Sequence, residues 1–324
     1  LTQTAQQLDP RHLSALRLLY EHPLLSACDL GAFLGVTDAT ADRYLRLLIQ
    51  LQLVSDRSTV TSIDRTFRDP NTSCEQIVEH AERYSLTRLG LELIVTSASI
   101  TAWRTNSAAV SPSPSAKGLP AYVARYEREV ASFAHILAHT AGVYSFFAQL
   151  ATLERDTGTS GSDHHLLWWE TGRACERYYR EIDGWHAVRP DGAGEYQVGQ
   201  RRVRFWLEWD RGTMNQRDLV IKFAAYTHYL RSREWCTDGN TPLPFLLIVT
   251  SDEGQEARIG AALNATLSSG TALPIRITQR ALLTDPGPRG PIWRMWTLAD
   301  TQHRSKGNYG RLGAPQTLFD DAVR

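Results

Sequence analysis

Apolar residues recur at helical spacing between residues 9 and 52, and they predict three short helices there. Each predicted helix begins or ends at a residue type that commonly caps helices. These cap and stop residues are Asp9 before Pro10, Ser26 with Asp29, Gly35, and Thr37 or Asp38. A short helix, a tight glycine turn and a second helix form the pattern of a helix-turn-helix.

Extended segments follow the three predicted helices. An arm is expected to run from residue 53 to residue 66, and a strand over residues 84–87 returns into a further helix that starts at Leu89. Two strands that close on a helix after a helix-turn-helix predict a wing, enlarged here by an insert around residues 67–81. We therefore predict a winged helix-turn-helix domain over residues 1–105.

The remaining chain differs in composition. Residues 106–120 are small, Ser-rich and interrupted by Pro, as in a linker. A long amphipathic helix is expected from residue 121 to about 154, and beyond it helical and extended patterns alternate, which is typical of a sheet covered by helices. We predict a mixed α/β fold with a connecting helix and an α/β domain over residues 121–300, and a C-terminal tail over residues 301–324.

Periodicity sets the elements expected within the α/β domain. The predicted helices are 166–180, 214–233 and 254–267, and the predicted strands are 184–188, 201–210, 244–250 and 274–278. The run over 244–250 is continuously apolar, which suits a fully buried central strand.

The composition limits the classes of protein to which the chain can belong. The chain has 324 residues, 42% of them hydrophobic, and 35 basic residues balance 35 acidic ones, so a phosphate-binding surface must be a local patch. Four scattered cysteines indicate neither a zinc site nor a disulfide framework. No apolar run reaches the length of a membrane span, and we expect a cytoplasmic protein without a membrane partner. No Gly-rich phosphate loop, zincin motif or Gly-x-Ser-x-Gly element is present.

The third predicted helix is the candidate recognition helix. Its outer face presents Thr40, Arg43, Arg46 or Leu47, and Gln50. Arginine and glutamine read base edges or grip phosphate in a major groove, which predicts double-stranded DNA as the partner. The alternatives are that these residues are solvated helix residues, or that the winged helix binds a protein; Asp38 and Asp42 would repel phosphate.

An acidic constellation lies in the second domain. Asp191 is expected in a turn between two strands, and alternation places Glu208 and Asp210 on one face at the end of a strand. Their carboxylates predict an oxygen pocket for Mg²⁺, or Mn²⁺, with Lys222 on the next helix leaning towards it. Alternatively, Asp191 is an ordinary turn residue, the two strand acids pair with nearby arginines, and Lys222 is solvated.

Pro-Asp, then Glu-x-Asp at a strand end, then a helical Lys resembles the PD-(D/E)XK nuclease superfamily, and hence a restriction-endonuclease-like domain. Asp210 occupies the place of the usual lysine, for which Lys222 would substitute. The resemblance implies that a helical acid upstream completes the site, with Glu170 as the first candidate and Glu176 as the second. Asp191 and Glu208 would hold one or two metal ions, with Asp210 either as a further ligand or as a hydrogen-bond acceptor for groups around the metal.

The order of motifs over residues 9 to about 250 resembles the replication-relaxation family. The motifs are Leu86-Thr87-x-x-Gly90, His135-x-Leu137, Arg189-Pro190-Asp191-Gly192, Leu207-Glu208-x-Asp210-x-Gly212-Thr213 and Lys222-x-x-x-Tyr226. Members of the replication-relaxation family are proteins of bacterial plasmids and integrative elements, akin to the MOBC class of conjugative relaxases.

The family resemblance implies sequence-specific binding of double-stranded DNA and metal-dependent, site- and strand-specific nicking at an origin of transfer or replication, without a covalent tyrosine intermediate. A coupling protein or relaxosome components would be further partners. The oligomeric state is left open, with a homodimer as one alternative. The alternative function is that of a non-catalytic DNA-binding regulator of replication or transcription that keeps a degenerate nuclease fold.

Overall fold

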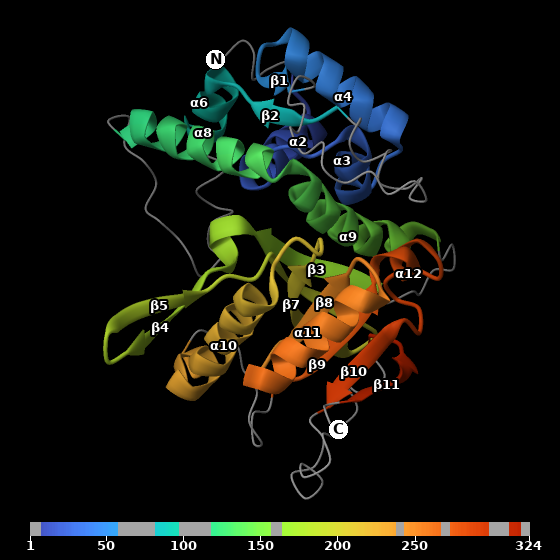
Figure 1. The fold of residues 1–324 in the computed structure, drawn as a ribbon. Coiled ribbons are helices and arrows are strands. Elements are labelled where there is room, and N and C mark those ends of the chain that lie inside the picture. The colour runs from blue at the N-terminus through green and yellow to red at the C-terminus, as the bar shows by residue number, and fades with distance from the viewer. Residues whose placement is uncertain are drawn as a thin grey trace, which may run out of the picture. The chain divides into compact units, whose positions relative to one another are not determined.

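The computed structural model describes residues 8–57, 82–96, 118–156, 164–237, 243–266, 273–297 and 311–318 (Figure 1). The chain divides into two compact units, Leu1–Thr152 and Leu153–Arg324. The described part of the first unit is built mainly of helices, and the second is built around a mixed sheet. The predicted mixed α/β class is therefore confirmed.

Three helices open the first unit, as the apolar spacing predicted. They are α2 Pro10–Glu21, α3 Ala27–Leu34 and α4 Asp38–Gln50. Each begins at a predicted cap, because the side chains of Asp9, Ser26 and Thr37 accept hydrogen bonds from N–H groups of the first turn. After α3, Gly35 takes the left-handed φ of 71° that glycine adopts without strain.

A two-stranded antiparallel sheet and a further helix complete a winged helix. The elements are β1 Val54–Asp56, β2 Tyr84–Leu86 and α6 Arg88–Thr96. A β-carbon at Gly90 would lie 2.1 Å from the carbonyl oxygen of Leu53, so glycine lets α6 approach the start of the wing. The predicted arm beyond residue 57 and the insert around residues 67–81 lie outside the described residues.

Two long helices, α8 Leu119–His135 and α9 Leu137–Asp156, follow and pack with the winged helix. The Tyr126 hydroxyl donates to the Leu19 carbonyl and accepts from the Leu86 N–H, both at 2.9 Å. The hydroxyl of Tyr144 donates to the carbonyl of Pro23, also at 2.9 Å.

The predicted domain boundaries differ from the boundary that these contacts support. A long helical segment with a break expected at Gly142 was predicted within a domain over residues 121–300, whereas the helices separate at Ile136 and α8 and α9 are bent by 96°. Residues up to Thr152 belong to the first unit because their tyrosines bond to its backbone. Most of the predicted linker, residues 106–117, lies outside the described residues.

A seven-stranded sheet, in the order β11-β10-β9-β8-β7-β6-β3, forms the centre of the second unit. Strands β7, β8 and β9 are parallel, and the other neighbours are antiparallel. The strands are β3 His164–Thr171, β6 Gly192–Val198, β7 Arg201–Trp209, β8 Phe245–Thr250, β9 Ile275–Gln279, β10 Trp293–Thr297 and β11 Arg311–Gln316.

Helices α10 Gln216–Ser232 and α11 Glu253–Thr266 lie side by side against one face of this sheet (Figure 1). Their apolar residues share a buried core with alternate residues of β7, β8 and β9. Members of this core include Leu219, Phe223, Ile259, Trp206, Ile248 and Ile277. From Leu246 onwards β8 is fully buried, which confirms the prediction of a central strand. The short helix α12 Arg280–Thr284 follows β9.

Residues 166–180 were predicted as a helix, and this prediction was wrong. β3 pairs with β6 along its length, and a 3₁₀ turn, η3 Gly172–Cys175, leads into the hairpin of β4 Arg177–Glu181 and β5 Gly184–Val188. Aromatic residues such as Trp168 and Trp169 fit a pleated surface well, and pairing with β6 outweighs the local helical spacing.

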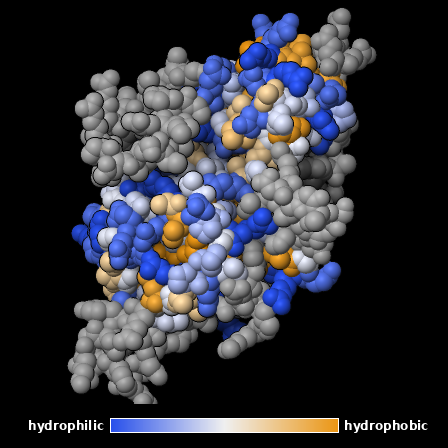
Figure 2. All heavy atoms as spheres, turned by 90° about the vertical axis from the view of Figure 1, so that its right-hand side faces the viewer, coloured by the Kyte–Doolittle hydropathy of each residue, from blue (hydrophilic) through white to orange (hydrophobic). Residues whose placement is uncertain are grey.

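The prediction of a C-terminal tail over residues 301–324 was also wrong in part, because β11 pairs with β10 at the edge of the sheet. This pairing depends on a distant strand and has no local signal. Within the described ranges, no single helix is long and apolar enough to cross a membrane; the bent pair Leu119–His135 and Leu137–Thr152 passes that test only together. On the face drawn in Figure 2, apolar residues form small patches among polar ones.

Candidate functional site

Asp191 and Glu208 lie next to each other at the ends of two neighbouring strands. Asp191 directly precedes β6, and its N–H donates to the Leu207 carbonyl at 2.9 Å. The Asp191 carboxylate in turn accepts the N–H of Trp209, with 2.8 Å between the nitrogen and Oδ2. The backbone of β7 therefore fixes the turn residue Asp191 beside the strand acid Glu208.

Helix α10 adds a cation and a hydroxyl to these two acids. The Lys222 ammonium forms an ion pair with Glu208 Oε2 and lies 3.7 Å from Asp191 Oδ2. One turn further along the helix, the Tyr226 hydroxyl donates to Glu208 Oε1. Three elements thus bring Asp191, Glu208 and Lys222 together, and we call these three residues with Tyr226 the acidic site.

Burial sets the electrostatics of the acidic site. The side chain of Glu208 is 2% exposed. Burial acts to raise the pKa of Glu208, and the Lys222 ammonium opposes this effect. Burial acts to lower the pKa of Lys222, but the carboxylates of Asp191 and Glu208 outweigh it and the pKa is raised. Burial, with Glu208 nearby, also raises the pKa of Tyr226, so Lys222 stays charged and Tyr226 stays a neutral donor near pH 7.

Asp210 lies just beyond the acidic site and has its own partners. Its carboxylate accepts the N–H of Gly212 at 3.1 Å. Burial raises the pKa of Asp210, and the polar Gln255 side chain and this hydrogen bond oppose that shift. In the parts of the chain that the structure describes, the three predicted metal ligands do not form a cluster whose oxygens all lie within 4.8 Å.

Glu170 lies on a strand, so its predicted helical placement was wrong. The pairing of Glu170 with Ala193, and of Ala193 with Trp206, places Glu170 on the sheet face that carries Glu208. Its carboxylate is 3.6 Å from the guanidinium of Arg177, and burial raises its pKa. The second candidate, Glu176, instead accepts the Tyr178 hydroxyl at 2.6 Å and pairs with Arg189 at 3.2 Å.

Tyr226 was not predicted as a site residue, although the motif Lys222-x-x-x-Tyr226 contains it. It does pack in the core, where its ring lies 5.6 Å from that of Trp206. Its separation of four residues from Lys222 was the available signal, because residues four apart share a helix face.

The predicted DNA-reading side chains all lie on the outer part of α4. Arg43 is exposed and donates to the Thr40 hydroxyl at 3.3 Å. Arg46, with a side chain 76% exposed, pairs with Asp42 at 2.6 Å, and Gln50 is exposed. The helix therefore presents two guanidinium groups to solvent, one of which already has an anionic partner.

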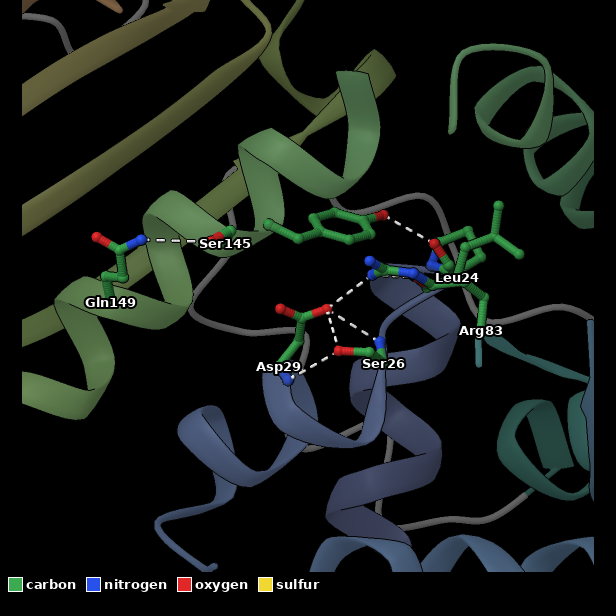
Figure 3. Close-up of polar contacts among 8 residues, drawn as sticks. Leu24, Ser26, Asp29, Arg83, Ser145 and Gln149 are labelled. Atoms are coloured by element: carbon green, nitrogen blue, oxygen red, sulfur yellow. Dashed lines mark hydrogen bonds and ion pairs between the residues drawn. The ribbon is translucent and has the colours of Figure 1, made fainter. Parts of the chain in front are cut away.

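A buried ion pair fixes the helix-turn-helix to the wing (Figure 3). Asp29 Oδ2 accepts from the N–H of Ser26 at 2.9 Å, from its hydroxyl at 2.7 Å, and from Arg83 Nη1 at 2.9 Å. Arg83 directly precedes β2, and Asp29 lies in the first turn of α3. The same carboxylate thus caps a helix and holds the returning strand of the wing.

Comparison with known proteins adds a family. A family model described as replication-relaxation matches residues 16–243. None of the curated proteins compared with the chain matches it. Among solved structures, the multiple antibiotic-resistance repressor MarR of Listeria monocytogenes 4b F2365 is 18% identical, and the match covers 40% of this chain and 80% of that chain with a TM-score of 0.22.

Proposed function

Because the chain belongs to the replication-relaxation family, we propose that it nicks double-stranded DNA at an origin of transfer or replication. In this proposal the winged helix holds the duplex and the acidic site cuts one strand. The observation that carries it is the convergence of Asp191, Glu208 and Lys222 from a turn, a strand end and a helix. A largely buried cluster of two acids and a lysine suits phosphodiester chemistry, and a purely structural role would need only one ion pair.

The residues present fit a divalent cation such as Mg²⁺ or Mn²⁺. Asp191 and Glu208 already contact one cation, the Lys222 ammonium, and carboxylate oxygens are the ligands that these metals prefer. When bound, the metal supplies neutralising charge at the scissile phosphate and lowers the pKa of its water. Asp191 and Glu208 would hold it, and Asp210 would join only by exchanging its hydrogen bond to Gly212.

The chain's own residues have distinct roles in this mechanism. Trp209 orients Asp191 through its backbone N–H, and the Tyr226 hydroxyl orients Glu208. Lys222 holds a positive charge beside the phosphate, where it stabilises the charge that grows during cleavage. Asp210 cannot supply this charge, although it stands where a strand lysine would be expected.

An exposed face of the β4–β5 hairpin offers a surface for the DNA close to the acidic site. Tyr178 and Trp185 are 54% and 66% exposed, and Trp185 is paired across the hairpin with Arg180, which is also exposed. Aromatic rings stack on bases, and arginines bind phosphates. The hairpin ends at Val188, three residues before Asp191. We assign contact with the DNA strand next to the cut to this face.

Cleavage of supercoiled plasmid tests the proposal. The plasmid carries the DNA that flanks the gene, and Mg²⁺ or Mn²⁺ is added with or without a chelator. We expect metal-dependent open circles from the wild type and none from Asp191→Ala or Glu208→Gln, while both variants still bind the duplex. Glu176→Gln is the matched control, because this acid pairs with Arg189 instead, and it should nick normally.

The alternative of a non-catalytic DNA-binding regulator makes the opposite prediction. Wild type and Asp191→Ala would then bind the same duplex equally, and neither would convert supercoiled plasmid to open circles with either metal. That result would remove the nuclease assignment and leave DNA binding in place.

A further inference from the structure

A second cluster of ligating side chains lies at the tip of the β4–β5 hairpin, separate from the acidic site. Glu181, Asp183 and His186 each offer a ligand atom, and these three atoms all lie within 4.8 Å of one another. His186 Nε2 is 2.8 Å from Asp183 Oδ1 and 4.0 Å from Glu181 Oε2. Among the described residues, no other group of three His, Cys, Asp or Glu side chains brings its ligand atoms this close together.

A fourth ligating side chain reaches the cluster from another element. His228 on helix α10 contacts Glu181 Oε1 through its Nδ1. The set therefore holds two imidazoles and two carboxylates, supplied by a strand, a turn, a second strand and a helix. An acidic surface patch without imidazoles would bind cations weakly, whereas mixed nitrogen and oxygen donors are typical of transition-metal sites.

The hairpin and its packing hold these side chains in place. Tyr179 pairs with His186, and Glu181 with Gly184, so that Glu181 and His186 lie on the same face of the hairpin as the buried Tyr179. The Tyr179 ring stacks against the imidazoles of both His186 and His228, with centroids 5.6 Å and 6.4 Å apart. Gly184 closes the tight turn with a φ of 138°, a conformation that other residues rarely adopt.

We propose that Glu181, Asp183, His186 and His228 form a binding site for a divalent transition metal, of which Zn²⁺ is the first candidate, that clamps the β4–β5 hairpin to helix α10. Two neutral imidazoles and two carboxylates balance the charge of a divalent ion. Donors around a tetrahedral zinc are about 3.3 Å apart, given bonds of about 2.0–2.1 Å. The donor separations of 2.8 Å and 4.0 Å require only small side-chain rotations to match.

The clamp metal differs in chemistry from the ion of the acidic site. Asp191 and Glu208 offer oxygen alone, which suits Mg²⁺, whereas the hairpin cluster adds nitrogen and favours zinc or another late transition metal. The clamp fastens the hairpin that leads into Asp191. Its metal is a structural ion of the second unit, and the binding of this ion does not depend on DNA cleavage.

Zinc titration of the full chain tests the clamp without measuring activity. After treatment with a chelator, calorimetry with Zn²⁺ alone should show a site that persists in Asp191→Ala. In His186→Ala, His228→Ala and Glu181→Gln its affinity should fall at least about tenfold, since even outer-shell changes cost that much. The exposed His135 on α8 provides the matched control, and His135→Ala should bind zinc as the wild type does.

Two further measurements keep the test decisive. Co²⁺ in place of Zn²⁺ should give the visible absorption of a four-coordinate site in the wild type and lose it in His186→Gln, a milder change checked for folding by circular dichroism. Zn²⁺ should raise the Tm of the wild type and leave that of His186→Gln unchanged. Equal zinc affinity in all variants, or a site lost only with Asp191→Ala, would show that the hairpin cluster is a set of salt bridges.

Discussion

Lys222 on helix α10 forms an ion pair with Glu208, which is buried at the end of β7. The long lysine side chain spans from helix to strand, and its charge is kept by the two carboxylates that it contacts. A charged lysine this close to a buried acid would be costly as a purely structural element, because desolvation opposes both charges. The pair therefore provides the strongest basis for predictions about catalysis.

We predict that Lys222→Ala lowers the single-turnover cleavage rate by about a hundredfold or more, a loss of about 2.7 kcal/mol in the transition state. Lys222→Arg should recover part of the rate, since it keeps the charge but changes the reach. Binding of duplex DNA should remain close to that of the wild type. Rates are measured at saturating Mg²⁺ with enzyme in excess over plasmid.

Asp210→Asn is the informative companion of Lys222→Ala. If Asp210 is a ligand of a second metal and Lys222 is a bystander, Asp210→Asn will be severely impaired and Lys222→Ala nearly normal. Our assignment expects the larger defect at Lys222, because the Asp210 carboxylate already accepts the N–H of Gly212.

A second prediction concerns where the DNA-binding unit ends. A fragment of residues 1–152 should fold and bind duplex DNA, whereas a fragment of residues 1–105 should be markedly less stable. The shorter fragment loses Tyr126, whose hydroxyl bonds to both α2 and β2, and the buried Tyr144. Urea unfolding followed by circular dichroism compares the two fragments. Equal midpoints would show that α8 and α9 add nothing to this unit.

Local signals predicted the elements whose periodicity and caps agree. Ser26 and Asp29 form the expected capping box, and Gly35 ends α3 as expected. The errors lie where pairing with a distant strand decides the outcome. Trp168 and Glu170 sit at spacings compatible with a helix, but β6 pairs with β3 on both sides of one irregularity between Leu166 and Trp168. Nothing within residues 311–316 signals their pairing with β10.

The acidic site was predictable to the extent that strand geometry fixes it. Alternation along β7 and a turn before β6 are enough to place Glu208 beside Asp191. The direction of the Asp210 side chain was not, because it depends on the turn after β7, where the N–H of Gly212 donates to the carboxylate. The hairpin cluster was hidden as well, since His228 is remote from Glu181 in the chain.

A third prediction is a pH-dependent loss of stability that arises at His22. This histidine is buried after α2, and burial lowers its pKa to about 3 from an ordinary value near 6.5. Between these pH values the unfolded chain binds a proton that the folded chain excludes. Stability from this residue is therefore complete above about pH 6.5 and is lost as the pH falls towards 3, by about 1.4 kcal/mol per pH unit.

The variant His22→Phe isolates this contribution, because it keeps an aromatic ring near Tyr144. Urea unfolding between pH 4 and pH 7.5 should give a free energy of unfolding that falls less steeply with acidity in the variant than in the wild type. Carboxylates elsewhere titrate equally in both proteins. Parallel slopes would mean that His22 is protonated in the folded state.

The last prediction distinguishes two arginines of the recognition helix by their partners. Arg43 donates to a neutral hydroxyl of the same helix, that of Thr40, whereas Arg46 is paired with Asp42 at 2.6 Å. A guanidinium that must first leave a carboxylate gains less from a phosphate, so Arg43→Ala should weaken duplex binding more than Arg46→Ala. If Arg43 contacts one phosphate, its removal should also reduce the slope of log affinity against log salt by about 0.9. Fluorescence anisotropy with a labelled duplex at several salt concentrations measures both quantities.

Asp42→Asn frees Arg46 and removes a charge that repels phosphate, and it should tighten binding. Equal, salt-independent binding by all three variants would assign α4 a role in binding protein instead of DNA.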